Sequence, residues 1–331
     1  MTEASLDVVG IGNAIVDIIA RCEDGLVARL GLSKGHMRLI EVDEVKSLYA
    51  EMGPAVETSG GSAANTIAGV ASFGGRAAFI GKTADDEFGR IFRHDIRSIG
   101  VAYDTVASSS GTPTARCLVF VTPDGERTMN TYLGVSPELA EAEVDTGVIG
   151  GATITYLEGY LFDRPAAKRA FSLAAATARK AGRKVALSLS DGFCVERHRA
   201  EFLDLIRNHV DILFANSDEI TALYETSFDE ACARVRKDAA LAAVTRSARG
   251  SIIISGGTTV EIAADPVARV VDTTGAGDLY AAGFLYGHAT GRSLETAGRL
   301  ASIAAAEAIS HIGPRPLVPL DRLAREKGLD I

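Results

Sequence analysis

Apolar runs and amphipathic segments alternate in a regular order along the second half of the chain. Three such pairs occur before residue 225: Thr153–Leu157 with a helical pattern near 165–181, Lys184–Leu189 with Arg199–Asn208, and Val210–Phe214 with Asp218–Tyr224. Short apolar strands separated by helices are typical of a parallel sheet that is covered on both faces. The alternation therefore predicts an α/β fold, with a doubly wound, mainly parallel sheet and helices on both sides.

A hairpin interrupts this order in the first half of the chain. Two apolar runs, 115–121 and 126–133, flank the sequence Thr-Pro-Asp-Gly at 122–125, which predicts a turn between antiparallel strands. Antiparallel strands do not fit into a parallel sheet. We therefore expect a small β-sheet lid over the binding site, formed by segments near 13–21, 36–40 and 114–133.

Composition sets outer limits on the kind of protein. The 331 residues are 47% hydrophobic, which is enough for a large core, and we predict one domain over residues 1–331 that includes the lid. A net charge of −9 argues against a nucleic-acid or membrane partner. Scattered cysteines and the lack of a signal-peptide pattern favour the cytoplasm. We expect a monomer or homodimer.

Residues 272–278, Asp-Thr-Thr-Gly-Ala-Gly-Asp, follow an apolar run and open into a helix of small residues. Gly275 and Gly277 leave backbone amides unobstructed where that helix begins. Unpaired amides and the positive end of the helix dipole attract anions. Asp278 lies in the first helical turn, where a base for phosphoryl transfer is needed. The helix dipole alone also favours an acid at this position.

A second glycine segment, Gly-Gly-Ser-Ala-Ala-Asn-Thr at 60–66, also leads into a helix of small residues. Gly60 and Gly61 permit a tight turn and a close approach of a ligand to the backbone. Asn65 offers one acceptor and two donors, which suits a ligand rich in hydroxyls. Asparagine at a helix start is also a common cap.

Together, the two segments resemble the PfkB (ribokinase-like) family of carbohydrate and nucleoside kinases. That family has an early Gly-Gly with a following Asn and a late Asp-Thr-Thr-Gly-Ala-Gly-Asp, and both occur here in the same order across nearly the whole chain. The resemblance implies a ribokinase-like fold with a lid, and phosphoryl transfer from ATP with Mg²⁺. Ligands of open α/β sheets bind at the carboxyl ends of the strands, where both segments should lie.

The resemblance implies roles for individual residues. Asp278 becomes the base, and the amides of Gly275, Ala276 and Gly277 hold the transferred phosphoryl group. Asp17, an acid within an apolar strand whose burial is costly without a partner, becomes a ligand of substrate hydroxyls. A solvated strand face is the alternative for Asp17. The early segment adds four substrate-binding residues: Gly60, Gly61, Ser62 and Asn65.

On the nucleotide side, the resemblance implies ATP binding by Asn216, Thr245, Ser247, Gly250, Thr273, Gly275 and Gly277. Ser247 stands where the family more often has glycine. Residues 216–219 match an Asn-x-x-Glu motif linked to magnesium and phosphate handling. Because Mg²⁺ keeps several waters, we expect Glu219 to act through water, although a helix capping box has the same pattern. Asp272 and Thr274 match a loop that binds a monovalent cation, such as K⁺, in some members.

The expected lid and the segment after residue 157 supply further candidates for substrate binding. Arg116, Asn130 and Tyr132 have equal parity on their strands, so we expect them to share one face of the lid. Tyr160 and Phe162 are suited to stacking on a purine. Aromatic residues near strands are more often simple core, and that alternative stays open. The six histidines show no metal-ligand spacing.

The sequence thus predicts an ATP-dependent kinase that phosphorylates a primary hydroxyl. Segments 60–66, 156–162 and 210–216 look more like bacterial nucleoside and adenosine kinases than like plain ribokinases, so we expect conversion of adenosine to AMP. A kinase for ribose, fructose or a related sugar is the alternative, because a sugar pocket and a ribose pocket share hydroxyl-binding residues. A non-catalytic nucleoside- or sugar-binding protein is a third hypothesis, which the intact turn and Asp278 argue against.

Two other nucleotide-binding classes fit poorly. Gly10-Ile11-Gly12 follows a strand, but Ile15 stands where a dinucleotide fingerprint needs its third glycine, and no helical pattern follows. The chain also lacks the Gly-x-x-x-x-Gly-Lys-Ser/Thr sequence of a Walker-type NTPase.

Overall fold

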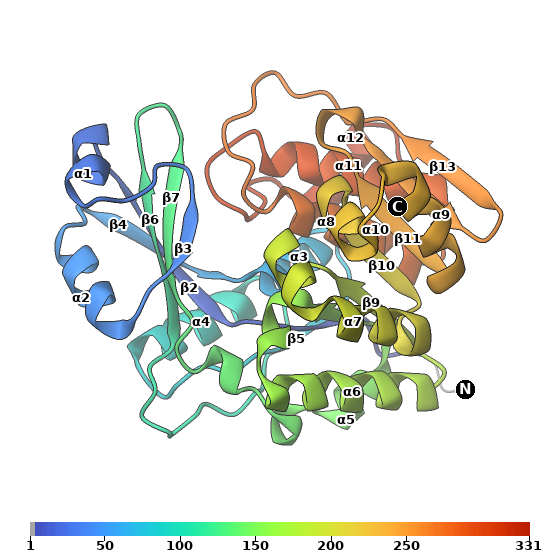
Figure 1. Cartoon of the computed structure of the whole chain (residues 1–331), viewed down its shortest axis with the longest axis horizontal. Helices are drawn as coiled ribbons and strands as arrows, with labels where there is room; N and C mark the ends of the chain where they lie inside the picture. The colour runs from blue at the N-terminus through green and yellow to red at the C-terminus, as the bar shows by residue number, and fades with distance from the viewer. Residues whose placement is uncertain (1–3) are drawn as a thin grey trace.

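The computed structural model, which describes residues 4–331, is built on two β-sheets (Figure 1). The larger sheet has eight strands in the order β13-β12-β11-β10-β9-β8-β1-β5, of which the run from β11 to β5 is parallel and the last pairings at β12 and β13 are antiparallel. Its strands are β1 (Leu6–Ile11), β5 (Ala77–Ile80), β8 (Ala152–Glu158), β9 (Lys184–Ser188), β10 (Ile212–Asn216), β11 (Leu241–Thr245), β12 (Ser251–Ser255) and β13 (Thr258–Ile262).

Helices cover both faces of the large sheet, as the alternation of apolar runs predicts. One face buries α3 (Ser62–Ser72), α10 (Ala276–Ala289), α11 (Leu294–Ala308) and α12 (Leu320–Glu326). The other face buries α5 (Thr146–Gly151), α6 (Pro165–Lys180), α7 (Gly192–His209), α8 (Ser217–Tyr224) and α9 (Phe228–Asp238). Alternate strand residues such as Val8 and Val9 enter opposite cores, which is the strand periodicity of two. The doubly wound α/β prediction is confirmed.

The smaller sheet has five strands in the order β3-β7-β6-β2-β4 and lies at the left of Figure 1. Its strands are β2 (Ile15–Arg21), β3 (Met37–Leu39), β4 (Ala55–Gly60), β6 (Ala115–Val121) and β7 (Arg127–Tyr132), accompanied by α1 (Asp24–Arg29), α2 (Val42–Ala50) and α4 (Glu87–Ser98). The predicted lid segments all lie in this sheet. Strand β4 was missed because the first half of Ala-Val-Glu-Thr-Ser-Gly is exposed and carries no apolar alternation.

Helices α3 and α10 approach each other unusually closely because small residues line their contact. A Cβ added to Gly69 of α3 would lie 2.5 Å from the Cβ of Ala282 in α10. A Cβ on Gly283 would likewise lie 2.5 Å from the carbonyl oxygen of Leu300 in α11. Such contacts leave no room for a larger side chain. The N-termini of α3 and α10 are therefore fixed relative to each other.

Two further features concern the chain as a whole. Among residues 4–331, no helix combines the length and the apolar character needed to cross a bilayer. Within that same range, the cysteines Cys22, Cys117, Cys194 and Cys232 are free thiols.

Candidate active site

The predicted anion turn lies at the start of α10. Gly275 is the N-cap with a left-handed backbone (φ +77°), and an added Cβ would lie 2.6 Å from the Cβ of Pro314. Gly277 has no positive φ, and no atom lies within 4 Å of an added Cβ, which shows open space above the turn. Gly275 is thus required by the fold, whereas Gly277 leaves room for a ligand.

The two glycine segments meet at the carboxylate of Asp278. The Ser62 hydroxyl donates to Oδ1 at 2.6 Å, and the Asn65 side-chain amide donates to Oδ2 at 3.0 Å. Desolvation raises the pKa of Asp278, while these two hydrogen bonds and the Arg315 charge act in the opposite direction. A carboxylate fixed by two donors at the positive end of a helix is positioned to accept a proton.

The Gly60-Gly61 turn is held by backbone geometry and by an acid that the sequence did not single out. Gly61 has φ +98°, and an added Cβ would lie 2.2 Å from the carbonyl oxygen of Asn13. The buried Glu158 carboxylate accepts from the Ala63 amide at 2.7 Å and from the Asn13 side chain at 2.6 Å. Burial raises the pKa of Glu158 to about 7. Glu158 therefore ties the start of α3 to the end of β1.

Asp17 lies on the lid strand β2 directly over Gly60. A Cβ on Gly60 would lie 2.4 Å from Oδ2 of Asp17, so only glycine fits beneath this carboxylate. Burial raises the pKa of Asp17 to about 6; Arg127 and Arg315 lower it, and Asp278 raises it further. Asp17 and Asp278 are thus close enough to repel each other. The lid brings one acid to the place where the body presents the other.

Arg315, in the loop after α11, supplies positive charge between these two acids. Its Nε and Nη2 donate to the Ser59 carbonyl oxygen at 3.2 and 2.8 Å, and Nη2 also reaches the Ser59 hydroxyl at 3.0 Å. The buried Nη1 has no hydrogen-bond partner among residues 4–331. Burial lowers the pKa of Arg315 to about 10, and the charges of Asp95, Asp17 and Asp278 oppose that shift. One N–H group of the guanidinium is left for a ligand.

A buried ion pair joins the lid to the loop that precedes the anion turn. Arg127, the first residue of β7, donates through Nη1 to Oδ2 of Asp272 at 2.6 Å, and both side chains are 4% exposed. The amides of Gly313 and Thr274 also donate to this carboxylate, each at 3.0 Å. Every oxygen of Asp272 thus has a donor within the protein.

Comparison with known proteins agrees with this geometry. A family model described as "pfkB family carbohydrate kinase" matches residues 32–320. The chain belongs to the pfkB family. It is therefore an ATP-dependent kinase that acts on a hydroxyl group, and the sequence-based identification of the family is confirmed.

Three similar proteins illustrate the spread of the pfkB family. The crystal structure of adenosine kinase from Sinorhizobium meliloti is 54% identical, with a TM-score of 0.92 over 98% of this chain and 100% of that one. A probable sugar kinase protein from Rhizobium etli CFN 42 is 50% identical, with a TM-score of 0.93 over 99% of this chain and 100% of that one. An ATP-dependent ribose-1-phosphate kinase of Halopiger xanaduensis is 31% identical over 88% of this chain and 96% of its own length.

The residues predicted to bind ATP gather at one edge of the large sheet of this kinase. Asn216 and Thr245 are register partners at the carboxyl ends of β10 and β11. Ser247 has φ +52°, a left-handed backbone that explains why glycine is common in the family at this position. Gly250 has φ +76°, and an added Cβ would lie 2.0 Å from the Ile262 carbonyl oxygen. Their role in binding ATP remains a prediction.

Glu219 forms the capping box that was considered as its alternative role. Its two carboxylate oxygens accept from the backbone amide of Asn216 at 2.9 Å and from the Asn216 side chain at 2.7 Å. The Asn216 side chain in turn caps α8. Burial raises the pKa of Glu219 to about 7. Among residues 4–331, no group of three or more His, Cys, Asp or Glu could hold a metal ion. The role of Glu219 toward magnesium stays a prediction.

The substrate-binding role predicted for Arg116, Asn130 and Tyr132 does not fit the structure. The three residues do share a face of the lid, but it is the face opposite to Asp17, which is the register partner of Cys117. On that outer face, Arg116 stacks on Phe88 of α4 at 4.7 Å, and the buried Asn130 binds Arg38 and the Leu118 carbonyl. Parity shows which residues share a face but not which face looks inward.

The two aromatic candidates, Tyr160 and Phe162, lie in different environments. Phe162 is 5% exposed and packs in the core against Phe202, with ring centroids 4.9 Å apart, and against Phe171. The stacking role predicted for Phe162 is therefore wrong. Tyr160 is partly buried; desolvation raises the pKa of its hydroxyl, and the charges of Asp191 and Asp278 add to that rise. A substrate contact of Tyr160 therefore stays a prediction, whereas Phe162 supports the helices behind it.

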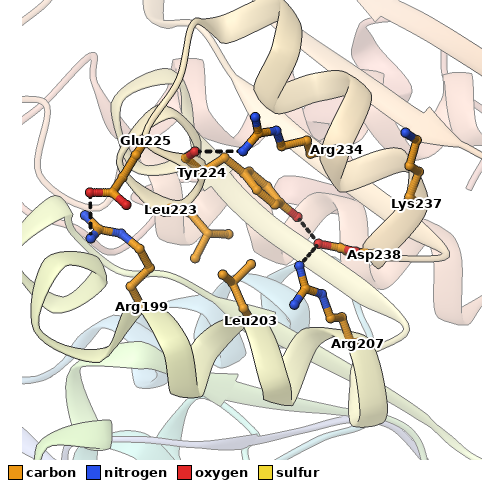
Figure 2. Close-up of a pocket in the computed structure, with 9 residues that line it drawn as sticks. All are labelled: Arg199, Leu203, Arg207, Leu223, Tyr224, Glu225, Arg234, Lys237 and Asp238. Carbon is orange, nitrogen blue, oxygen red and sulfur yellow. Dashed lines mark hydrogen bonds and ion pairs between the residues drawn. The ribbon is translucent and has the colours of Figure 1, made fainter.

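The cavity drawn in Figure 2 lies away from all the predicted residues. Its volume is about 360 Å³, and it is lined by α7, α8 and α9. Arg199 pairs with Glu225 and Arg207 pairs with Asp238, each at 3.0 Å, as the dashed lines show. These ion pairs are partly exposed and contribute little to stability, and the lining includes none of the predicted site residues.

Sequence reasoning missed Glu158, Arg315 and Arg127. Glu158 had the same signal as Asp17, because both are acids within or at the end of an apolar strand. Arg127 follows the hairpin turn, and Arg315 stands between two prolines, so neither belongs to a local pattern. Only the folded chain places them beside the anion turn.

Proposed function

We propose that this kinase phosphorylates the primary hydroxyl of a nucleoside, with adenosine converted to AMP. The observation that carries the substrate class is the 54% identity, over 98% of this chain, to the adenosine kinase of Sinorhizobium meliloti. The site agrees with a ribose: Asp17 and Asn65 converge on the anion turn, and Oδ1 of Asn65 is buried without a partner among residues 4–331. Tyr160, an aromatic residue at the same edge, is suited to contact a purine.

In this proposal Asp278 is the general base. The substrate oxygen loses its proton to the Asp278 carboxylate and attacks the terminal phosphorus of ATP, and the bond to the ADP oxygen breaks. Ser62 and Asn65 hold the carboxylate at 2.6 and 3.0 Å. Desolvation raises the Asp278 pKa, which makes the carboxylate a stronger base once it is ionised. Both donors fix its orientation toward the hydroxyl.

The transferred phosphoryl group gains charge stabilisation from the turn and from Arg315. Gly277 and Asp278 occupy the second and third positions of α10, where amides have no acceptor within the helix, whereas the Ala276 amide already donates to the Thr273 carbonyl oxygen at 3.2 Å. The free Nη1 of Arg315 adds a full positive charge near Asp278. Preorganised donors aimed at developing charge are usually the largest contribution to such catalysis. Arg315 has that role in our proposal.

The nucleotide occupies the edge formed by the ends of β10 and β11 and the turn of α10. Asn216, Thr245, Ser247 and Gly250 line the first part, and Thr273, Gly275 and Gly277 line the second. When bound with ATP, Mg²⁺ neutralises phosphate charge, and Glu219 would hold it through water.

A sugar kinase is the second candidate, favoured by one observation. The Rhizobium etli protein, 50% identical over 99% of this chain, is described as a probable sugar kinase. Asp17 and Asn65 serve the hydroxyls of a ribose or a hexose equally well. A non-catalytic binding protein is the weakest candidate, because a protein without catalytic activity does not require a carboxylate that two donors hold in place at Asp278.

Release of ADP from ATP and Mg²⁺ tests this proposal, with adenosine, ribose and fructose offered separately to the same preparation. We expect the highest kcat/KM with adenosine, and AMP as the product by chromatography. Asp278→Asn serves as the blank for contaminating kinases. Efficient phosphorylation of a free sugar without adenosine turnover would replace the nucleoside by a sugar and leave the roles of Asp278 and the turn in place.

A further inference from the structure

The carboxylate of Asp272 is buried in the loop before the anion turn, and its charge is already paired within the protein. Arg127 lies 2.6 Å from Oδ2, both side chains are 4% exposed, and the Gly313 and Thr274 amides complete the shell at 3.0 Å. In a buried place a guanidinium that close gives a strong attraction, since water screens the pair only weakly.

This is the carboxylate at which the family resemblance predicts a monovalent cation. A potassium ion on Asp272 would have to share the oxygens with two amides and lie beside the guanidinium of Arg127. Two cations on one enclosed carboxylate repel each other, and the ion would also lose its hydration shell. The residues around Asp272 therefore do not fit a monovalent ion while Arg127 is present.

We propose that Arg127 is a built-in cation for the anion turn: its guanidinium takes the place of a monovalent ion at Asp272, so docking of the lid organises the turn and potassium does not. Arg127 touches no reacting atom and is a positioning residue that acts through Asp272.

Because Arg127 belongs to the lid, replacing a potassium ion by its guanidinium couples the lid to the anion turn. Arg127 begins β7, directly after the hairpin turn of the lid, and pairs with Val121 of β6. The same hairpin meets the anion-turn loop a second time, since a Cβ on Gly125 would lie 3.1 Å from the Val271 carbonyl oxygen. Asp272 in turn caps the loop, through the Thr274 amide. The positive charge at Asp272 therefore comes from the lid itself and not from a dissolved ion.

The test is thermal unfolding of three proteins in potassium, sodium or choline chloride at equal ionic strength. Wild type should melt at one temperature in all three salts. Arg127→Gln leaves Asp272 buried and unpaired, so a small cation should now bind it and raise the Tm with potassium concentration, by on the order of 2 °C or more over choline. Asp272→Asn is the matched control. It breaks the same Arg127–Asp272 pair but also removes the negative charge that would attract a cation, so its Tm should not depend on which cation is present.

Either of two results would overturn the inference: a wild-type Tm or kcat that rises specifically with potassium, or an Arg127→Gln protein whose Tm responds no more than that of Asp272→Asn. If Arg127→Gln does not fold, the wild-type comparison and Arg127→Lys still decide. Lysine keeps the charge, so that variant should stay insensitive to potassium. The inference rests on the proposed role of the turn and not on adenosine. Because melting needs no substrate, its failure is distinct from failure of the nucleoside proposal.

Discussion

The two sheets of this kinase differ in how firmly their residues are held. Around the large sheet, α3, α10 and α11 bury almost every side chain of their inner faces, and the close contacts at glycine leave no room for a larger side chain. In the small sheet, the edge strands β3 and β4 expose Leu39 and Val56 by 58% and 68%. The proposed base, Asp278, therefore lies on the more tightly packed part, while Asp17 and Arg127 lie on a part with fewer packing constraints. In our proposal, chemistry and substrate capture are divided between the two sheets.

The largest effect expected from this division is at Asp278. Asp278→Asn keeps the shape of the side chain but removes its basicity, so kcat should fall roughly 10²–10⁴-fold, with little change in ATP affinity. Steady-state kinetics and a thermal melt measure both. Asp229→Asn, the same change in the first turn of α9, is the matched control and should be silent. A kcat near that of wild type would remove Asp278 from the mechanism.

The turn itself allows a comparison between neighbouring glycines. Gly277→Val places its side chain in open space where a phosphoryl group would lie, so kcat/KM should fall at least tenfold while the Tm stays nearly unchanged. Gly275→Val must adopt φ +77° against Pro314, which costs on the order of 1–3 kcal/mol and should lower both activity and Tm. Parallel losses of Tm in the two variants would mean that Gly277 is structural.

Arg315 should contribute less than the base. Arg315→Gln removes one charged donor, and kcat should fall roughly 10- to 100-fold, as expected for a hydrogen bond to a charged group. Arg93→Gln is the control, since Arg93 also donates to a backbone carbonyl and lies partly buried, but on α4 beside Tyr103. If kcat is unchanged and only the Tm drops, Arg315 braces Ser59 and has no part in transfer.

The aromatic pair probes the boundary between the site and its support. Tyr160→Ala should lower kcat/KM for adenosine by about fivefold, the equivalent of roughly 1 kcal/mol of ring contact, and leave a free sugar unaffected. Phe162→Ala should instead cost about 3–5 kcal/mol of folding free energy, because it opens a cavity beside Phe202. Kinetics with adenosine and ribose, followed by denaturant unfolding, separate the two. Equal selectivity in both variants would contradict the placement of Phe162.

The smallest effects concern pH. A general base must be ionised, so kcat/KM should fall as the pH becomes acidic, because desolvation raises the pKa of Asp278 and burial raises the pKa of Asp17 to about 6. Asp17→Asn removes a charge that repels the Asp278 carboxylate, so the fall of kcat/KM at acidic pH should move to lower pH. Arg315→Gln removes an attracting charge and should move it to higher pH. Shifts in the same direction would show that the two residues do not act on Asp278.

Much of the fold could be predicted because its signals are local. Strand and helix periods placed β8, β9 and β10 with the helices that follow them, and two glycine segments located the anion turn. The lid was harder. Arg116, Asn130 and Tyr132 have the right parity, yet their common face turns toward α4 and α2, because the packing of the whole sheet decides which side looks inward. Arg127 and Arg315 contribute through contacts 145 and 256 residues away along the chain. Sequence periodicity describes contacts between nearby residues and could not predict contacts over such separations.

The close contact between Gly69 and Ala282 has a consequence for how such an enzyme diversifies. It locks α3 to α10, so the separation between Asn65 and Asp278 is inherited from helix packing and is independent of any loop. Exchanging the hairpin and edge strands of the lid for those of a relative should alter which molecule is admitted and leave the reaction centre intact. If the proposed roles hold, ligand preference and catalytic competence are separable traits in this architecture.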